Sequence, residues 1–222
     1  MSTTIYKKNI KFTPSYVNNS LHVIKKVTNL KTLRELTEVS TSDAEAMYIN
    51  IDPEEGIPTI EKYINLFGHE CKSFIPKALI INLLRLIMTM NVFQFGSTWR
   101  IQCIGTAMGT PCACAYATLF FAYHECTYLQ EKYAENLLLY IRFIDDILFV
   151  WKHSTKSTNT FASFKQDLND RCKLNWKTEK LSKSVNFLDL TLTIKTDIPE
   201  KYELISIHSC TIRASPWTYN KP

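Results

Sequence analysis

The chain has 222 residues, of which 45% are hydrophobic, enough for one large domain or two small ones with a substantial core. Lys and Arg exceed Asp and Glu by 26 − 21 = 5, a mildly basic balance that suits a nucleic-acid partner without requiring one. The seven cysteines are odd in number and contain no C-x-x-C pair, which excludes a disulfide framework and a cysteine-based zinc site. No signal peptide is visible, and the most apolar stretch, residues 78–90, contains Asn82 and Arg85 and is too short to span a bilayer. We therefore expect a soluble intracellular protein.

The N-terminal part of the chain predicts one helix and one strand. Residues 1–20 are polar and without periodicity, so we expect no regular element there. A short amphipathic helix follows, with an apolar face formed by Leu21, Ile24, Val27 and Leu30. Residues 39–51 then predict a strand that ends near Asp43 and gives way to a turn.

Two helices are expected between residues 56 and 90. Pro58 marks the start of the first helix and Gly68 its end, because proline suits a first helical turn and glycine a helix terminus. Pro76 opens the second helix, which is apolar almost all round and is therefore expected to be buried.

The rest of the chain alternates hairpins and helices. The expected elements are a hairpin over residues 92–104, a long helix capped by Thr110 from Pro111 to about Ala134, a hairpin over 140–151, a helix over 157–170, and a strand over 185–194 that pairs with 202–207. Because strands and helices are interspersed and the hairpins are antiparallel, the predicted fold class is α+β.

Two adjacent carboxylates, Asp145 and Asp146, interrupt an otherwise apolar, β-favouring run. Charge in such a run is costly unless it is paired, bound to a metal or placed at a turn. Alternation along a single strand puts Asp145 on the face of Phe143 and Ile147 and Asp146 on the opposite face, so one aspartate projects into a given site, and we take it to be Asp145. A plain hairpin turn explains the pair equally well, since Asp favours turns.

Four segments carry a distinctive order and spacing. Asp43 precedes Met-Tyr-Ile-Asn-Ile at residues 47–51 and Glu-Gly-Ile at 55–57, and residues 105–111 are Gly-Thr-Ala-Met-Gly-Thr-Pro. Arg-Phe-Ile-Asp-Asp begins at Arg142, and Asn-Phe-Leu-Asp-Leu begins at Asn186. This order resembles the palm of reverse transcriptases and, more narrowly, that of Penelope-like retroelements. The resemblance covers about residues 20–222, and the second motif is the most specific because seven consecutive residues agree.

The resemblance implies a two-metal polymerase. Asp43, Asp145 and Asp146 would hold two Mg²⁺ ions, for which Mn²⁺ can substitute, and would catalyse templated nucleotidyl transfer. Elementary electrostatics agrees, because two bare carboxylates about 4 Å apart repel by ~4 kcal/mol at an effective dielectric constant near 20, and a cation relieves that repulsion. Taken without the other motifs, Asp43 is better explained as an aspartate at a strand end or turn.

The resemblance also implies substrate-binding residues. Tyr48, five residues after Asp43, would lie under the sugar and exclude a ribose 2′-OH, which favours deoxynucleotides; its alternative interpretation is a half-buried core tyrosine. Met108 and Gly109 would face the incoming nucleotide, and Phe143 joins them as a substrate-binding residue. The glycines permit a tight backbone, while ordinary helix-start packing explains Pro111 but not the whole Gly-Thr-Ala-Met-Gly run.

Other candidates have simpler explanations. Lys177 and Lys180 precede the Phe-Leu-Asp strand, where many polymerases keep a lysine that protonates pyrophosphate, but solvated hairpin lysines explain each of them better. His124 and Glu125 lack the partners of a metalloenzyme motif and are interpreted as a helix-surface pair.

The predicted organisation is a remnant of the fingers at residues 1–38, a palm at 39–184, and a hairpin at 185–222 where the connection to a missing thumb begins. The predicted function is an RNA-directed DNA polymerase fragment of a retroelement, acting on dNTPs with an RNA or DNA template and a DNA primer. No membrane partner is expected, and a nuclear location follows from the resemblance alone. Two alternatives stay open: a catalytically inactive nucleic-acid-binding remnant, and an unrelated α+β protein in which Asp43 and Asp145 do not converge.

Overall fold

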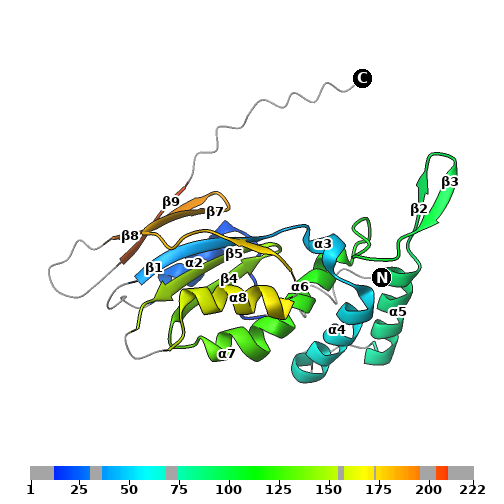
Figure 1. Ribbon diagram of the computed structural model, residues 1–222, viewed down its shortest axis with the longest axis horizontal. Coiled ribbons are helices and arrows are strands. Elements are labelled where there is room, and N and C mark those ends of the chain that lie inside the picture. The colour runs from blue at the N-terminus through cyan, green and yellow to red at the C-terminus, as the bar shows by residue number, and fades with distance from the viewer. Residues whose placement is uncertain are drawn as a thin grey trace, which may run out of the picture.

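The computed structural model describes residues 13–30, 37–68, 75–154, 158–172, 174–195 and 204–209. Its centre is a four-stranded antiparallel sheet in the order β4-β5-β1-β6 (Figure 1). The strands are β1 (Thr37–Ala44), β4 (Leu137–Phe143), β5 (Asp146–Lys152) and β6 (Trp176–Thr178). Strand β5 is almost wholly apolar because it is covered on both faces.

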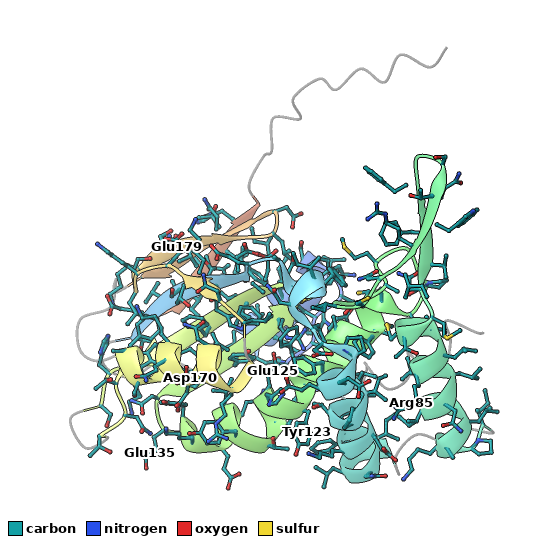
Figure 2. All side chains as sticks on the ribbon, turned by 45° about the vertical axis from the view of Figure 1, so that its right-hand side comes forward. Arg85, Tyr123, Glu125, Glu135, Asp170 and Glu179 are labelled. Carbon is teal, nitrogen blue, oxygen red and sulfur yellow. The ribbon has the colours of Figure 1, made fainter. Side chains whose placement is uncertain are left out.

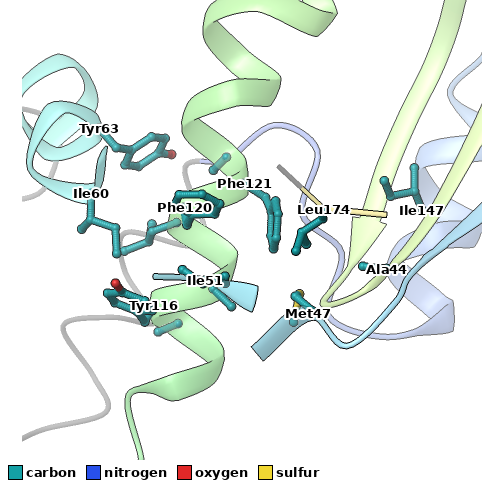
Figure 3. Close-up of a cluster of buried hydrophobic side chains, with 14 of the residues drawn as sticks. Ala44, Met47, Ile51, Ile60, Tyr63, Tyr116, Phe120, Phe121, Ile147 and Leu174 are labelled. Carbon is teal, nitrogen blue, oxygen red and sulfur yellow. The ribbon is translucent and has the colours of Figure 1, made fainter. Parts of the chain in front are cut away.

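Helices cover one face of this sheet. They are α6 (Ala113–His124), the π-helix η2 (Glu125–Leu129), α7 (Gln130–Lys132) and α8 (Phe161–Cys172), and α4 (Pro53–Phe67) packs on the outer side of α6. Helix α6 is apolar on all sides because it lies between α4 and the sheet (Figure 3). Phe121 of α6 meets Trp176 edge-on, and Phe149 and Trp151 of β5 pack against Phe164 of α8.

A smaller layer covers the other face. It consists of α2 (Ser20–Thr28) and an antiparallel sheet of β7 (Ser184–Phe187), β8 (Leu190–Lys195) and β9 (Leu204–Ser209). Val23, Ile141, Leu148 and Leu192 form the apolar contact between this layer and the central sheet. The Ser20 hydroxyl donates to Asp189, which ties the start of α2 to the β7–β8 turn.

A third region extends from the helical side. Helix α5 (Lys77–Thr89) packs against α4 and leads into a two-stranded hairpin, β2 (Val92–Phe95) and β3 (Thr98–Ile101). Every residue of both strands is exposed, and their side chains point into solvent (Figure 2). The hairpin projects away from the main body (Figure 1).

The mixed helix and antiparallel-sheet class is confirmed, as are the helix near residues 21–30, the strand that reaches Asp43, and the hairpins at 92–104 and 140–151. Residues 1–12 and 210–222 lie outside the described part of the chain, so the expectations for them are not tested.

Some helix predictions were wrong in detail. Helix α4 begins at Pro53 with Asp52 as its N-cap, so Pro58 lies inside the helix rather than at its start. Helix α5 buries Ile80, Leu84 and other residues on one side, but Leu86 is 55% exposed, so its apolar sequence does not mean full burial. Leu21 is likewise exposed on α2, where Val23 and Val27 are buried instead.

One strand prediction and one further helix prediction also need correction. The expected single strand at residues 185–194 is the hairpin β7–β8, which turns at Leu188 and Asp189. The long helix after the second motif begins at Ala113 rather than Pro111, without a side-chain cap from Thr110, and changes to a π-helix at Glu125. Glu125, the first residue of that π-helix, is only 1% exposed, so interpreting His124 and Glu125 as a surface pair was wrong.

Candidate active site

Two of the three predicted carboxylates face each other across neighbouring strands. Asp43, next to the last residue of β1, pairs in register with Asp146, the first residue of β5, and with Lys177 of β6 on its other side. Residues paired across an antiparallel sheet point to the same face. The same three residues line a pocket of about 260 Å³, which Asn186, Phe187 and Leu188 close from the β7–β8 hairpin.

Asp145 lies in the two-residue turn between β4 and β5. Phe143 pairs with Asp146 across this turn, so the alternation expected for one continuous strand was wrong, because the chain reverses between Ile144 and Asp145. The structure therefore brings Asp146, and not Asp145 alone, to Asp43. The Asp145 carbonyl accepts a hydrogen bond of 3.1 Å from the Ala44 amide, which fixes the turn against the end of β1.

Asp146 lies close enough to Asp145 and Asp43 for their charges to affect it. The pKa of Asp146 is raised to about 6, first by burial and then by the negative charges of Asp145 and Asp43. A carboxylate cluster with this property favours a bound cation, which removes the repulsion that raises the pKa. The Ala44 amide, next to Asp43, donates to the Asp145 carbonyl, which argues against the alternative of an unrelated α+β protein in which Asp43 and Asp145 do not converge.

The second motif packs against the short helix that contains Tyr48. The Thr106 amide donates to the Tyr48 carbonyl over 2.6 Å, which joins residues 105–110 to α3 (Met47–Asn50). Gly105 has a φ of +85°, and a Cβ there would lie 2.8 Å from the Ile49 Cα. Only glycine fits that conformation and that close approach.

The Tyr48 side chain lies near residues of two other segments, Cys114 and Asp145. Its pKa is raised to about 12, first by burial, then by the charge of Cys114 and a hydrogen bond with it, and then by the charge of Asp145. Tyr48 therefore lies between the helix that follows the second motif and the turn of the third. It is half-buried, as both interpretations of this residue require.

The remaining candidates differ in their exposure and in their contacts. Met108 is 62% exposed, and Gly109 has no atom within 4 Å of the position of a Cβ, so both face open space. Phe143 packs with the apolar cluster of the smaller layer on the face that carries Asp146. Lys177 lies directly opposite Asp43, whereas Lys180 follows the end of β6 and is exposed.

The donor set fits a divalent cation that keeps several waters. Among the described residues, no group of three or more His, Cys, Asp or Glu side chains is arranged as a complete metal site. Mg²⁺ does not need one, because it is usually bound by one or two carboxylates together with waters and substrate phosphates. Asp43 and Asp146 supply two such carboxylates on one face, and Asp145 supplies a third at the adjacent turn.

Sequence reasoning missed the polar group buried behind this turn. Glu125 and Arg142 form an ion pair in which both side chains are almost completely buried. One sequence signal was present: Glu125 follows a helix that is apolar on all sides, and a charge that continues such a helix is in a position to be buried.

The described residues also contain no helix long and apolar enough to cross a membrane.

The central antiparallel sheet, with its aspartates at a strand end and a hairpin turn and its helices on one face, is similar in fold to solved telomerase structures. The apo telomerase of Candida tropicalis is similar over 86% of this chain and 38% of its own, with a TM-score of 0.61 and 14% identity. The Candida albicans telomerase, solved with a TWJ fragment of telomeric RNA, is similar over 86% of this chain and 37% of its own, with a TM-score of 0.60 and 11% identity.

These likenesses show the fold alone, since the identities are low. The chain spans less than half the length of each of these telomerase chains. A protein-family search and a search of curated proteins found no match.

Proposed function

We propose that this chain is the catalytic palm segment of an RNA-directed DNA polymerase that adds deoxynucleotides to a primer 3′-OH. The observation that carries the proposal is the register pairing of Asp43 with Asp146 beside the Asp145 turn, on a polymerase-like fold. The finer assignment to Penelope-like retroelements, with a nuclear location, rests on the sequence motifs.

The reaction joins the primer 3′-oxygen to the α-phosphorus of a dNTP and releases pyrophosphate. Asp43, Asp146 and Asp145 would hold two Mg²⁺ ions, which when bound lower the pKa of the attacking hydroxyl and neutralise charge on the leaving group. Asp43 and Asp146, which point to one face, would form the metal-binding face, with Asp145 at its edge. Lys177, paired with Asp43, is the better placed of the two lysines to donate a proton to pyrophosphate.

The docked second motif would hold the nucleotide. The Thr106 amide holds the Tyr48 backbone carbonyl, and the Tyr48 side chain lies near enough to Asp145 for the charge of Asp145 to raise its pKa. The Tyr48 ring would exclude a ribose 2′-OH. The open space at Gly109 and the exposed Met108 side chain leave room for a base and sugar. RNA or DNA template, DNA primer and dNTPs are the proposed partners.

Primer extension with saturating RNA template and DNA primer tests this proposal, in Mg²⁺ and in Mn²⁺, with dNTPs and with NTPs. Asp43→Asn and Asp146→Asn should abolish extension. Asp189→Asn is the matched control, because Asp189 occupies the same place in the β7–β8 turn as Asp145 does in its turn.

Extension that survives in both aspartate variants would refute the assignment. Binding of the template–primer without extension by any protein, the unsubstituted chain included, would favour a non-catalytic nucleic-acid-binding remnant. Extension with NTPs equal to that with dNTPs would remove the sugar-selecting role of Tyr48.

A further inference from the structure

The ion pair between Arg142 and Glu125 is buried behind the Asp145–Asp146 turn. The exposure of the side chains is 0% for Arg142 and 1% for Glu125, and Figure 2 shows Glu125 in the middle of the molecule, between the sheet and the helices. Burying two charges is costly, and an apolar pair of similar volume often stabilises a protein as well or better. Packing alone therefore does not explain this pair.

Glu125 is held in place by four hydrogen bonds. Its Oε1 accepts from the Tyr140 hydroxyl at 2.9 Å and from Arg142 Nε, and its Oε2 accepts from the Ser15 hydroxyl at 2.5 Å and from Arg142 Nη2 at 3.3 Å. The carboxylate thus fixes the guanidinium plane. It comes from the first residue of a π-helix, an irregularity that is frequent at functional sites.

The other donors of Arg142 reach two backbone carbonyls. Nη1 donates to the Ile144 carbonyl at 2.9 Å, and Nη2 donates to the Thr118 carbonyl of α6 at 3.0 Å. The planar fork of arginine can make these bonds and the pair with Glu125 at once, which a lysine ammonium cannot. Arg142 therefore connects the helical layer directly to the turn.

The turn has a strained backbone, and both of its carbonyls are held by hydrogen bonds. Ile144 has a φ of +56°, in the left-handed region that β-branched residues rarely adopt. Arg142 holds the carbonyl of Ile144, and Ala44 holds that of Asp145, so both peptide units that orient the aspartates are fixed.

The β7–β8 turn provides a comparison within the chain. Leu188 there has a φ of +55° and is followed by Asp189, as Ile144 is followed by Asp145. The residue in the place of Arg142 is Asn186, whose side chain accepts from Thr191 on the neighbouring strand. A turn of this shape therefore forms without a buried arginine. This indicates that Arg142 is not needed to form the turn and instead determines where the turn lies.

We propose that Arg142, oriented by Glu125, is a positioning residue that holds the Ile144–Asp145 turn so that Asp145 and Asp146 meet Asp43 in a metal-binding arrangement. The part that concerns metal rests on the proposed function. A purely structural ion pair would affect stability without moving the turn relative to β1.

Two variants and one matched control test this proposal. Arg142→Lys removes the planar guanidinium, and Glu125→Gln keeps Arg142 but removes the negative charge of the ion pair. If Arg142→Lys does not fold, Glu125→Gln still tests the proposal. Val150→Ala is the control, since Val150 is fully buried on β5 and packs in a cluster away from the turn. Each protein is studied at a temperature where it is fully folded.

The first measurement is Mn²⁺ affinity by electron paramagnetic resonance titration. We expect at least a tenfold weaker affinity in Arg142→Lys and Glu125→Gln, and less than a twofold change in Val150→Ala. Unchanged affinity in both pair variants, or an equal loss in the control, would overturn the proposal.

The second measurement is hydrogen exchange at the Ala44 amide, which donates to the Asp145 carbonyl. Its exchange should accelerate at least tenfold in the pair variants relative to amides at the centre of β1. In Val150→Ala the amides of β1 should change together. If the unsubstituted chain binds no Mn²⁺, the proposed function fails, while Ala44 exchange still decides whether Arg142 positions the turn.

Discussion

Gly105 and Gly109 belong to the same loop of the candidate site but have different surroundings. A Cβ at Gly105 would lie within 3.0 Å of backbone atoms of Tyr48 and Ile49, and φ is +85° there, whereas a Cβ at Gly109 would meet nothing within 4 Å. Gly105→Ala should therefore lower the free energy of unfolding by about 3 kcal/mol, combining left-handed strain with a backbone clash. Gly109→Ala should change it by less than ~0.5 kcal/mol. Urea denaturation of the two variants checks this, and equal losses would contradict the docked loop.

The same two substitutions separate fold from function. Because Gly109 faces open space, we expect Gly109→Ala to leave the fold intact and to reduce nucleotide addition if a nucleotide packs there. Full activity of Gly109→Ala would place the nucleotide elsewhere.

Asp146 predicts a specific dependence of stability on pH. Its pKa is raised to about 6, so between pH ~4, where an unfolded aspartate titrates, and pH 6 the folded chain binds more protons than the unfolded chain. The contribution of Asp146 therefore makes the free energy of unfolding fall as pH rises through that window and stay lower above it. Asp146→Asn removes this fall in the free energy of unfolding. Allowing for solvent screening, the variant should be more stable than the unsubstituted chain by about 1–2 kcal/mol at pH 7.5 and no more stable at pH 4.

Urea denaturation at pH 4 and pH 7.5 in metal-free buffer measures this difference. Adding Mg²⁺ at pH 7.5 should stabilise the unsubstituted chain and narrow the gap, since a cation offsets the repulsion around Asp146. An advantage of Asp146→Asn that is larger at pH 4 than at pH 7.5 would contradict the raised pKa.

Between elements, the contact of α4 with α6 depends on Gly56. A Cβ there would lie 2.1 Å from the Tyr116 hydroxyl oxygen and 2.8 Å from its Cζ, and Tyr116 is fully buried (Figure 3). Gly56→Ala should therefore destabilise the chain by about 1–3 kcal/mol despite the better helix propensity of alanine.

The companion variant Tyr116→Phe identifies the cause of this loss. Among the described residues the Tyr116 hydroxyl has no hydrogen-bond partner, so its removal alone should cost little. In the double variant the phenylalanine should restore most of the stability that Gly56→Ala loses. Thermal unfolding of the four proteins forms a double-mutant cycle, and additive effects would show that the hydroxyl is not the obstacle.

Elements whose signals are local were predicted well, and those that depend on distant contacts were not. The 140–151 hairpin and the end of β1 at Asp43 follow from apolar runs and turn residues close in sequence. The pairing of Asp43 with Asp146 depends on the register between strands about a hundred residues apart, which one sequence does not encode locally. The apolar helix before Glu125 is a local signal that this residue is buried, but its partners Ser15, Tyr140 and Arg142 lie far apart in the sequence, so no local pattern reveals them.

On the scale of the whole molecule, exposed apolar residues are concentrated on one side. Most of the large exposed ones among the described residues lie between residues 79 and 108, on α5, the β2–β3 hairpin and the loop that follows. Phe95 and Trp99 of the hairpin are each 70% exposed, and an isolated two-stranded hairpin is marginally stable in water. A surface of this kind promotes association of the isolated chain.

Replacing both aromatic residues tests this consequence. Phe95→Thr with Trp99→Thr keeps β-favouring residues in the strands and should change the free energy of unfolding by less than ~1 kcal/mol, because little buried contact is lost apart from the Arg100 guanidinium over the Phe95 ring. Binding of a hydrophobic dye and concentration-dependent light scattering should both fall. Leu21→Thr is the matched control, since Leu21 is 75% exposed on α2, away from this region, and its replacement should alter neither signal. Equal effects of the two changes would mean that total exposed apolar area, rather than its concentration around the hairpin, governs association.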